Sequence, residues 1–309
     1  MSGSTDKVIE VNNLVKSYGT VKAVDQISFD VSRGEVFGML GPNGAGKTTT
    51  VEIIEGLRSA DSGSAIVLGI DVARDSRAVK ERIGIQPQSP ALFPSLTVRE
   101  TIRFFRSLYR KSVPTSRIVE LASLQASRDT LFKNLSGGQQ QRLSVSLAFV
   151  NDPEIIFLDE PTTGLDPQAR RAMWDVIETF RRARKTVVLT THYMEEAQRL
   201  CDRIAIMDYG KIIALDSPQR LIESHIRESA IQFKMKDYPG DEVLTALPDI
   251  SKVIREDDDV IVYTNNIPSA ISGLLQMASR RSTEIAELSV RQATLEDVFL
   301  KLTGKRIRD

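Results

Sequence analysis

A glycine-rich stretch, GPNGAGKTTT at residues 41–50, constrains the fold of this 309-residue chain more than any other feature. Gly41, Gly46, Lys47 and Thr48 fit the pattern G-x-x-x-x-G-K-[ST]. The run EVFGML before the stretch is typical of a strand, and VEIIEGL after it has helical spacing. In this setting the backbone N–H groups of the loop can approach phosphate oxygens, and the helix N-terminus adds a partial positive charge. The sequence therefore predicts a phosphate-binding loop, with Lys47 on the phosphates and the Thr48 hydroxyl on magnesium.

The overall composition limits the class of protein. Hydrophobic residues make up 41% of the chain, which is enough for a core, and 41 basic residues balance 41 acidic ones. Bulk attraction to nucleic acid or anionic lipid is therefore not expected. The single cysteine, Cys201, cannot form an intrachain disulfide and fits a reducing compartment. Because MSGSTDKVIE offers no secretion signal and no run approaches about 18 apolar residues, we expect any membrane role to come through a partner.

Strand-like and helical patterns alternate along most of the chain. Residues 8–40 are typical of strands separated by turns, and residues 97–150 of helices, the first of which opens with Thr97 and Glu100 as a capping box. The apolar runs EIIFLDE and TVVLTTH indicate two further strands on either side of a charged helix. Apolar strands that alternate with amphipathic helices predict a parallel sheet with helices on both faces.

The pattern changes near residues 217–230. Beyond this point IQFKM, KVI, VIVY and EIAELSV are typical of strands, with a helix over 268–280 and a last helix opening at Thr294. We therefore expect a first domain over residues 7–222 and a small α+β accessory domain over residues 223–309.

A second motif is IIFLDE. Its four apolar residues predict a buried strand whose end delivers Asp159 and Glu160 to the edge of a parallel sheet at which ligands bind. There Asp159 can hold magnesium, directly or through water, and Glu160 can act on a water that attacks a terminal phosphate. Adjacent acids at a strand end can also be a solvated exit, and this motif alone leaves both interpretations open.

A third motif, LSGGQ, places Ser136, Gly137, Gly138 and Gln139 immediately before a helical pattern. Ser136 would cap that helix, and the free N–H groups there could receive a phosphate. The alternative is an ordinary Ser-Gly-Gly cap, because the chain already has one phosphate-binding loop.

Taken in order, GPNGAGKT, LSGGQ and IIFLDE resemble the nucleotide-binding subunit of ATP-binding cassette (ABC) transporters, over about residues 7–220. The resemblance implies an α/β fold, the P-loop ABC ATPase cassette, with a parallel-sheet core, an N-terminal antiparallel β subdomain and an α-helical subdomain. It also implies ATP hydrolysis with ATP and Mg²⁺ as cofactors. The P-loop residues that it implies for ATP binding are Gly41, Pro42, Asn43, Gly44, Ala45, Gly46, Lys47, Thr48 and Thr49.

Further positions follow from the same resemblance. Tyr18, in SYG, matches the aromatic residue on which the adenine stacks, and His192 matches the histidine that contacts the γ-phosphate. Gln88 matches the glutamine of the loop that senses magnesium and the membrane partner; Gln86 is the competing candidate, and the Pro-Gln pair favours Gln88. Asp166, in TGLD, matches the loop that crosses to the other subunit.

The resemblance also explains why the chain has a second phosphate-binding motif, LSGGQ, since in this family two subunits face head to tail. ATP on the P-loop of one subunit is covered by Ser136, Gly137, Gly138 and Gln139 of the other. The implied catalytic residues are Glu160, His192 and Gln88, and the implied magnesium ligands are Thr48, Gln88 and Asp159. Because the glutamate and LSGGQ are both intact, two identical copies could form two competent sites, and we expect a homodimer, with a heterodimer as the alternative.

The tail bears on the direction of transport. ATLEDVFLKLTG, in which Thr294 and Asp297 can cap the last helix and a glycine ends it, resembles the closing segment of ABC-2-type exporter ATPases, including those for drugs and antibiotics. The implied partner is a transmembrane permease, through which the chain would lie on the cytoplasmic face of the cell membrane. No nucleic acid partner is expected.

The permease would dock on the helical segment between Gln88 and Ser136. The apolar residues available there are Phe93, Leu96, Phe104, Phe105, Leu108 and Tyr109, and their helical spacing places most of them in the core. Two other functions stay open. One is a soluble ABC ATPase acting on nucleic acid or ribosomes, against which the single cassette argues, and the other is an importer ATPase whose tail, residues 225–309, binds a regulatory small molecule.

Overall fold

The computed structural model describes residues 6–88, 91–226, 229–256, 259–291 and 293–304. The chain divides into two compact units, one up to Pro218 and one from Gln219 onward. Each unit has a sheet and a hydrophobic core of its own. No helix within the described ranges is both long and apolar enough to cross a bilayer.

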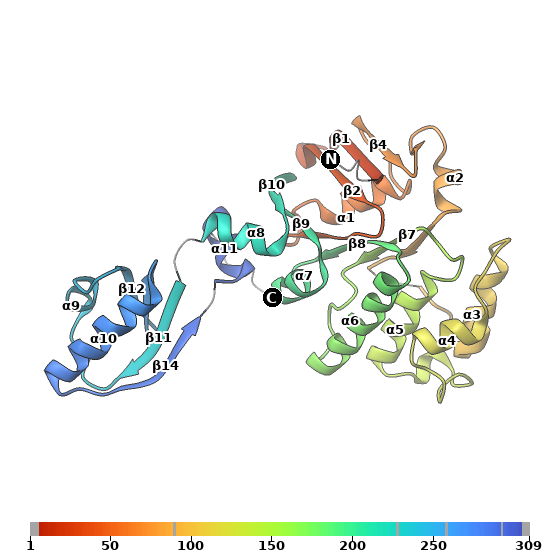
Figure 1. The fold of residues 1–309 in the computed structure, drawn as a ribbon. Coiled ribbons are helices and arrows are strands. Elements are labelled where there is room, and N and C mark those ends of the chain that lie inside the picture. The colour runs from red at the N-terminus through yellow and green to blue at the C-terminus, as the bar shows by residue number, and fades with distance from the viewer. Residues whose placement is uncertain (1–5, 89–90, 227–228, 257–258, 292, 305–309) are drawn as a thin grey trace. The chain divides into compact units, whose positions relative to one another are not determined.

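A six-stranded sheet forms the centre of the first unit (Figure 1). Its order is β10-β9-β3-β8-β7-β6, in which only β10 runs antiparallel to its neighbour. Its strands are β3 (Val36–Leu40), β6 (Ile83–Gln86), β7 (Ile155–Asp159), β8 (Thr186–Thr191), β9 (Arg203–Asp208) and β10 (Lys211–Asp216). Every residue of β3, β7 and β8 is buried, because both faces of the sheet are covered. The predicted parallel sheet is confirmed.

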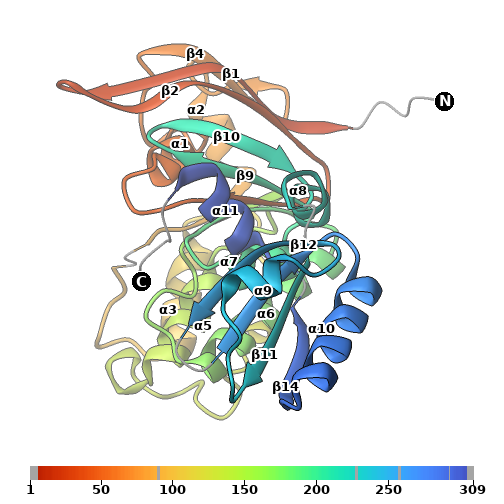
Figure 2. The same ribbon diagram turned by 90° about the vertical axis from the view of Figure 1, so that its left-hand side faces the viewer.

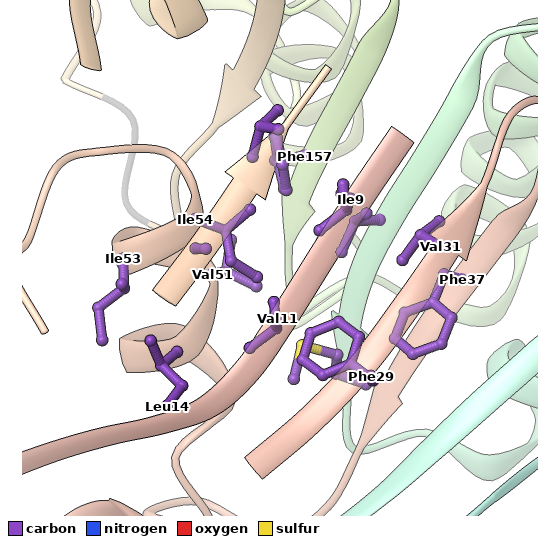
Figure 3. Close-up of a cluster of buried hydrophobic side chains, with 14 of the residues drawn as sticks. Ile9, Val11, Leu14, Phe29, Val31, Phe37, Val51, Ile53, Ile54 and Phe157 are labelled. Carbon is purple, nitrogen blue, oxygen red and sulfur yellow. The ribbon is translucent and has the colours of Figure 1, made fainter. Parts of the chain in front are cut away.

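An antiparallel sheet of order β2-β1-β4-β5 packs on the same core as the helix that follows the glycine-rich loop. Its strands are β1 (Lys7–Tyr18), β2 (Val21–Ser32), β4 (Ser62–Val67) and β5 (Ile70–Asp71), and the helix is α1 (Lys47–Ile54). Figure 3 shows side chains of β1, such as Ile9 and Val11, gathered with Ile54 of α1 and Phe157 of β7. This shared core fixes α1, and with it the loop, between the two sheets.

The other helices of the first unit are α2 (Ser76–Lys80), α3 (Val98–Ser107), α4 (Thr115–Leu121), α5 (Gly137–Leu147), α6 (Pro167–Arg182) and α7 (Met194–Leu200), with a short 3₁₀ turn, η1 (Phe132–Asn134). Among these, α3, α4 and α5 share a separate hydrophobic core. Ile102 of α3, Ile118 of α4 and Leu143 of α5 pack together. Thr97 and Glu100 form the predicted capping box at the start of α3.

The second unit contains a βαββαβ arrangement with strand order β12-β13-β11-β14, the split-βαβ topology. Its elements, with α8 leading into it, are α8 (Pro218–His225), β11 (Ser229–Met235), α9 (Asp241–Thr245), β12 (Ile250–Glu256), β13 (Asp259–Thr264), α10 (Ile267–Arg281), β14 (Ile285–Arg291) and α11 (Leu295–Thr303). Leu274 of α10 and Leu244 of α9 share a core with Phe233 of β11, and Figure 2 shows α10 running along the sheet. Thr294 and Asp297 form the expected capping box at the start of α11.

Candidate nucleotide-binding and catalytic site

The glycine-rich loop joins the end of β3 to the start of α1, as the sequence predicts. Its glycines are required by close approach of other backbone. A Cβ atom at Gly46, where φ is +98°, would lie 2.1 Å from the carbonyl oxygen of Ala23. One at Gly41 would lie 2.3 Å from the carbonyl oxygen of Met207. The loop is therefore packed so tightly that only glycine fits at Gly41 and Gly46. Because α1 begins directly after the loop, the N-terminus of the helix points toward the space that the loop encloses.

Lys47 is the first residue of α1, and only 4% of it is exposed. Its Nζ atom donates hydrogen bonds to the carbonyl oxygens of Gly41, at 2.7 Å, and Pro42, at 3.1 Å. It also lies 3.4 Å from Oε1 of Glu160. Burial lowers the pKa of Lys47, and the Glu160 carboxylate opposes that shift. The ammonium group is thus held within the loop and coupled to the acid at the end of β7.

Asp159 lies opposite the next residue of the helix. The Thr48 hydroxyl donates to Oδ1 of Asp159 at 3.2 Å, and the Thr190 hydroxyl of β8 makes a short hydrogen bond to the same oxygen. Burial raises the pKa of Asp159, partly offset by these hydrogen bonds. A hydroxyl and a buried carboxylate are the oxygen ligands that Mg²⁺ takes alongside water and phosphate, so Thr48 and Asp159 fit a magnesium ion. The described residues hold no group of three or more His, Cys, Asp or Glu suited to a metal, and a phosphate-bound Mg²⁺ needs none.

Three of the predicted residues, Lys47, Gln88 and His192, lie around Glu160. Its Oε2 atom accepts hydrogen bonds from Gln88, at 3.3 Å, and from the Thr163 hydroxyl, at 3.1 Å, and it lies 3.3 Å from Nδ1 of His192. Burial raises the pKa of Glu160, but Lys47 first and then His192 lower it by more, so that the net shift is downward. The buried carboxyl group is therefore held in its anionic form, as a proton acceptor must be.

The backbone at Glu160 is constrained as well. Its φ of +47° is uncommon for a residue with a side chain. The conformation is held by the N–H of Glu160, which donates to the Thr190 hydroxyl at 3.0 Å. Thr190 therefore positions both acids, although the sequence motifs do not indicate it, whereas Thr163 is the first residue of the TGLD motif. Thr190 lies inside an apolar strand sequence, which carries no signal for this role.

The two candidate glutamines differ in their surroundings. Gln86 ends β6, is only 1% exposed, and donates to the carbonyl oxygen of Pro87 at 2.6 Å. Gln88 is exposed and reaches Glu160. This geometry supports the preference for Gln88 over Gln86.

LSGGQ lies at the start of α5. Ser136 and Gln139 form a capping box, in which the Ser136 hydroxyl accepts from the Gln139 N–H and Gln139 Oε1 accepts from the Ser136 N–H. Ser136 and Gly137 are exposed, and together with Gly138, Gly164 and Asp166 they line a cavity of about 360 Å³. LSGGQ and the TGLD loop thus form one surface.

One contact ties this surface to the acids. The side chain of Gln141, one turn into α5, donates to the carbonyl oxygen of Pro161, directly after Glu160, at 2.9 Å. Within the described part of the chain, however, no hydrogen bond or ion pair joins Ser136 to Lys47, Thr48 or Glu160. One copy therefore brings the P-loop and the acids together and holds LSGGQ on a surface of its own.

Tyr18 ends β1 and is 42% exposed. The guanidinium carbon of Arg58 lies 5.4 Å from the centre of its ring, and Nζ of Lys16 lies 5.8 Å away. Arg58 is in turn held by Glu52 of α1, whose carboxylate accepts from Nε at 2.6 Å. The ring is thus steadied by cations and remains open to stacking.

Comparisons with known proteins agree with this arrangement. The family model described as ABC transporter matches residues 24–163. The Nod factor export ATP-binding protein I of Ralstonia nicotianae is 36% identical over 99% of this chain and 97% of its own length. The protein of the same name from Burkholderia orbicola is 39% identical over 97% of this chain and 98% of its own.

Solved structures give the same result. A dimeric ATP-binding cassette in a post-hydrolysis state, bound to ADP and Pi, matches with a TM-score of 0.62 and 25% identity over 68% of this chain and 98% of that one. A subunit of an ABC transporter complex from Clostridium perfringens matches with a TM-score of 0.64 and 25% identity over 71% and 91%. This chain belongs to the ATP-binding subunits of ABC transporters. It is an ATPase, and the residues matched by the family model, 24–163, lie in its first unit.

Proposed function

We propose that this chain powers an exporter: it binds ATP between two copies arranged head to tail and drives a separate transmembrane permease. The separation of the site into two surfaces carries the proposal. Lys47 and Glu160 lie 3.4 Å apart, whereas Ser136 is exposed beside Asp166 and, among the described residues, makes no hydrogen bond or ion pair with either. A second copy could supply LSGGQ to the P-loop of the first. The names of the relatives, which are Nod factor export proteins, favour export over import.

Each side chain at the acids then has a task that follows from its contacts. Lys47 neutralises the β- and γ-phosphates, exchanging its bonds to loop carbonyls for stronger bonds to anionic oxygens. Glu160 accepts the proton of the attacking water, and Gln88 and His192, which both face its Oε2 atom, orient that water and the γ-phosphate.

The remaining side chains and loop amides would bind Mg²⁺, the adenine and the phosphates. Thr48 and Asp159 would hold Mg²⁺, which neutralises charge on the phosphates when bound. Tyr18 offers its exposed ring to the adenine. The loop N–H groups that would surround the phosphates belong to Gly41, Asn43, Gly44, Ala45, Gly46 and Thr49, and Pro42, which has no N–H, would shape the loop between them.

Mixing two inactive variants tests the head-to-tail arrangement. Lys47→Ala should disable the P-loop side of a site, and Ser136→Arg should block the LSGGQ side. If the two sides come from different copies, mixed dimers contain one site with both defects and one intact site. Randomly formed dimers from an equal mixture should then recover about one quarter of the wild-type sites. A mixture that stays as inactive as its parts would show that each chain uses its own LSGGQ, and would reject the proposal.

An exposed aromatic patch on the helical segment supports the permease partner. Phe93, Phe104, Leu108 and Tyr109 are between 36% and 62% exposed. The rings of Phe93 and Phe104 meet edge to face, with their centres 5.2 Å apart. The expectation that most of the six residues named above lie in the core is wrong, since these four are exposed and Leu96 and Phe105 are only partly buried. The helical stripe of α3 that packs inward is formed by Val98, Thr101 and Ile102 instead.

We infer that a short permease helix covers this patch, since it is continuous with the segment that carries Gln88 and since ATP-binding subunits of this family act on a membrane partner. Leu108→Glu should abolish co-purification with the permease and leave the ATPase rate of the isolated chain within twofold. Arg103→Glu, on an exposed position of the same helix, is the matched control. Retained co-purification by Leu108→Glu would exclude the patch. Attachment through this patch would place the chain at the cytoplasmic face of the membrane.

A further inference from the structure

A fully buried carboxyl group, that of Glu196 in the first turn of α7, lies among elements that lead to the catalytic residues. It has no exposed surface, and its Oε1 atom accepts a hydrogen bond from the indole N–H of Trp174 on α6 at 3.1 Å. The hydroxyl groups of Thr162 and Thr191 face the same carboxyl group. Thr162 is two residues past Glu160. Thr191 ends β8, directly before the histidine of the site. Glu196 therefore meets α6, β8 and the loop after β7 at one point.

A second contact joins the same elements. The Tyr193 ring lies 4.2 Å from the His192 ring, centre to centre, and the guanidinium carbon of Arg170 on α6 lies 4.1 Å from the centre of the Tyr193 ring. Arg170 and Trp174 are four residues apart and so occupy one face of α6. The turn from His192 to Glu196 is thus attached to α6 at two successive helical turns.

His192 needs such support, because no hydrogen bond from the described residues holds the Nδ1 atom of its ring. This Nδ1 atom lies 3.3 Å from Oε2 of Glu160. The role proposed for His192 depends on how its ring lies relative to the Glu160 carboxylate. The orientation of the ring must therefore come from the backbone turn and from what the turn packs against.

The same face of α6 leads to the TGLD loop. Asp166 caps the helix by accepting the Ala169 N–H at 2.8 Å, and Arg170 is one turn further on. Around Glu196 several buried polar atoms lack a hydrogen bond of normal geometry within the described ranges, namely Oε2 of Glu196, Oγ1 of Thr162 and Nε of Arg170. Unpaired buried polar atoms are unfavourable, so this packing is free to gain hydrogen bonds if α6 shifts.

We propose that Glu196 and Trp174 are positioning residues for His192. They fix the turn that carries the histidine to the first turns of α6, so that a shift of the Asp166 loop moves the ring relative to Glu160. The inference rests on the proposed function for the catalytic role of His192 and for the contact of the Asp166 loop with a second copy.

A double-mutant cycle of ATP turnover on the full chain tests this inference. Trp174→Phe removes the N–H donor and keeps an aromatic ring. We expect kcat to fall at least fivefold while the Kd for ATP changes less than twofold. In a His192→Ala background the same substitution should change the remaining kcat less than twofold, because the residue acts through the histidine. An equal loss in both backgrounds, or no loss in either, would overturn the proposal.

Two further variants separate positioning from stability. Arg199→Gln removes the exposed guanidinium that lies 4.9 Å from the centre of the Trp174 ring, and it should leave kcat unchanged. Trp174→Phe with Glu196→Leu removes the N–H donor and its acceptor together, which should restore thermal stability. If kcat recovers along with the melting temperature, the pair is only structural and the proposal fails.

The two histidines of the chain, His192 and His225, provide a spectroscopic test that does not depend on catalysis. With histidine-selective ¹³C labelling, Glu196→Leu should shift the ring signal of His192 and leave that of His225 in place. His225→Gln assigns the two signals. An unmoved His192 signal would overturn the inference. If instead His192→Ala leaves kcat unchanged, the proposed catalytic role of His192 fails, and the signal still decides whether Glu196 positions the ring.

Discussion

Nζ of Lys47 lies 3.4 Å from Oε1 of Glu160, and both side chains are 4% exposed. In a buried pair of opposite charges, each charge compensates the other. Removing one partner leaves the other charge buried and uncompensated, which is strongly unfavourable. The pair joins the phosphate-binding loop to the proposed general base. It also explains why Glu160, which is buried, has a lowered pKa.

Replacing Glu160 by Gln should separate ATP binding from ATP hydrolysis. Gln keeps the shape but cannot accept a proton, so we expect hydrolysis to slow by about 10² to 10⁴. The loop and Lys47 remain, so ATP still binds and a closed dimer persists. Phosphate release and size-exclusion chromatography in ATP measure the two effects. Glu195→Gln, an exposed acid on α7, is the control. Normal turnover by Glu160→Gln would remove this residue from the mechanism.

Replacing Lys47 by Ala should act first on binding. Hydrogen bonds between charged groups contribute about 1.5–3 kcal/mol, so the Kd for ATP should rise about 10- to 150-fold. Burial of Glu160 would then be less opposed, and the pKa of that carboxyl group should rise. Calorimetric titration with ATP measures the affinity, with Lys111→Ala at an exposed position as the control. An unchanged Kd would contradict the P-loop assignment.

Local sequence chemistry predicts the parts of this site that depend on neighbouring residues. The loop between β3 and α1, the cap by Ser136 and the cap by Thr294 each involve residues within a few positions, and each is confirmed. Glu160 and Gln88 are 72 positions apart, and their contact at 3.3 Å depends on the β6–β7 pairing. Such a contact follows from sheet topology rather than from any pattern along the chain.

Two other features lie beyond the sequence patterns for different reasons. Strands β4, β5, β6, β9 and β10 and helix α9 are not among the predicted elements, because they are short and tertiary pairing stabilises them more than local preference does. The exposed face of α3 illustrates the second limit. Helical spacing shows that Phe104 and Ile102 lie on different faces but not which face is covered.

The exposed ring of Tyr18 should contribute to ATP affinity only by stacking on the adenine base. Stacking on an aromatic side chain is worth about 1–3 kcal/mol, so Tyr18→Ala should weaken ATP binding about 5- to 150-fold. Tyr18→Phe, which retains the ring, is the matched control and should bind within about threefold of wild type. Inorganic triphosphate has no base, and its Kd should not respond to either variant. A loss of triphosphate binding in Tyr18→Ala would mean that the substitution disturbs the loop instead.

Glu55 should make the stability of the chain depend on pH. It directly follows α1, is 4% exposed, and has a pKa raised to about 8 from an ordinary 4.5 by burial first and then by the nearby carboxylates of Asp159 and Glu52. Between these two pH values the folded chain holds a proton that the unfolded chain has released. The free energy of unfolding therefore falls as pH rises through this window.

Glu55→Gln tests this directly, because the amide keeps the size of the neutral acid and cannot ionise. At pH 5, just above the ordinary pKa, the free energies of unfolding of variant and wild type should agree within about 1 kcal/mol. Near pH 9 the variant should be more stable, by up to about 5 kcal/mol if burial acts in full. Urea unfolding across this pH range measures the difference, with the exposed Glu81→Gln as the control. Parallel stability profiles for Glu55→Gln and wild type would mean that Glu55 ionises without opposition in the folded chain, and that the negative potential around Asp159 is weaker than this geometry requires.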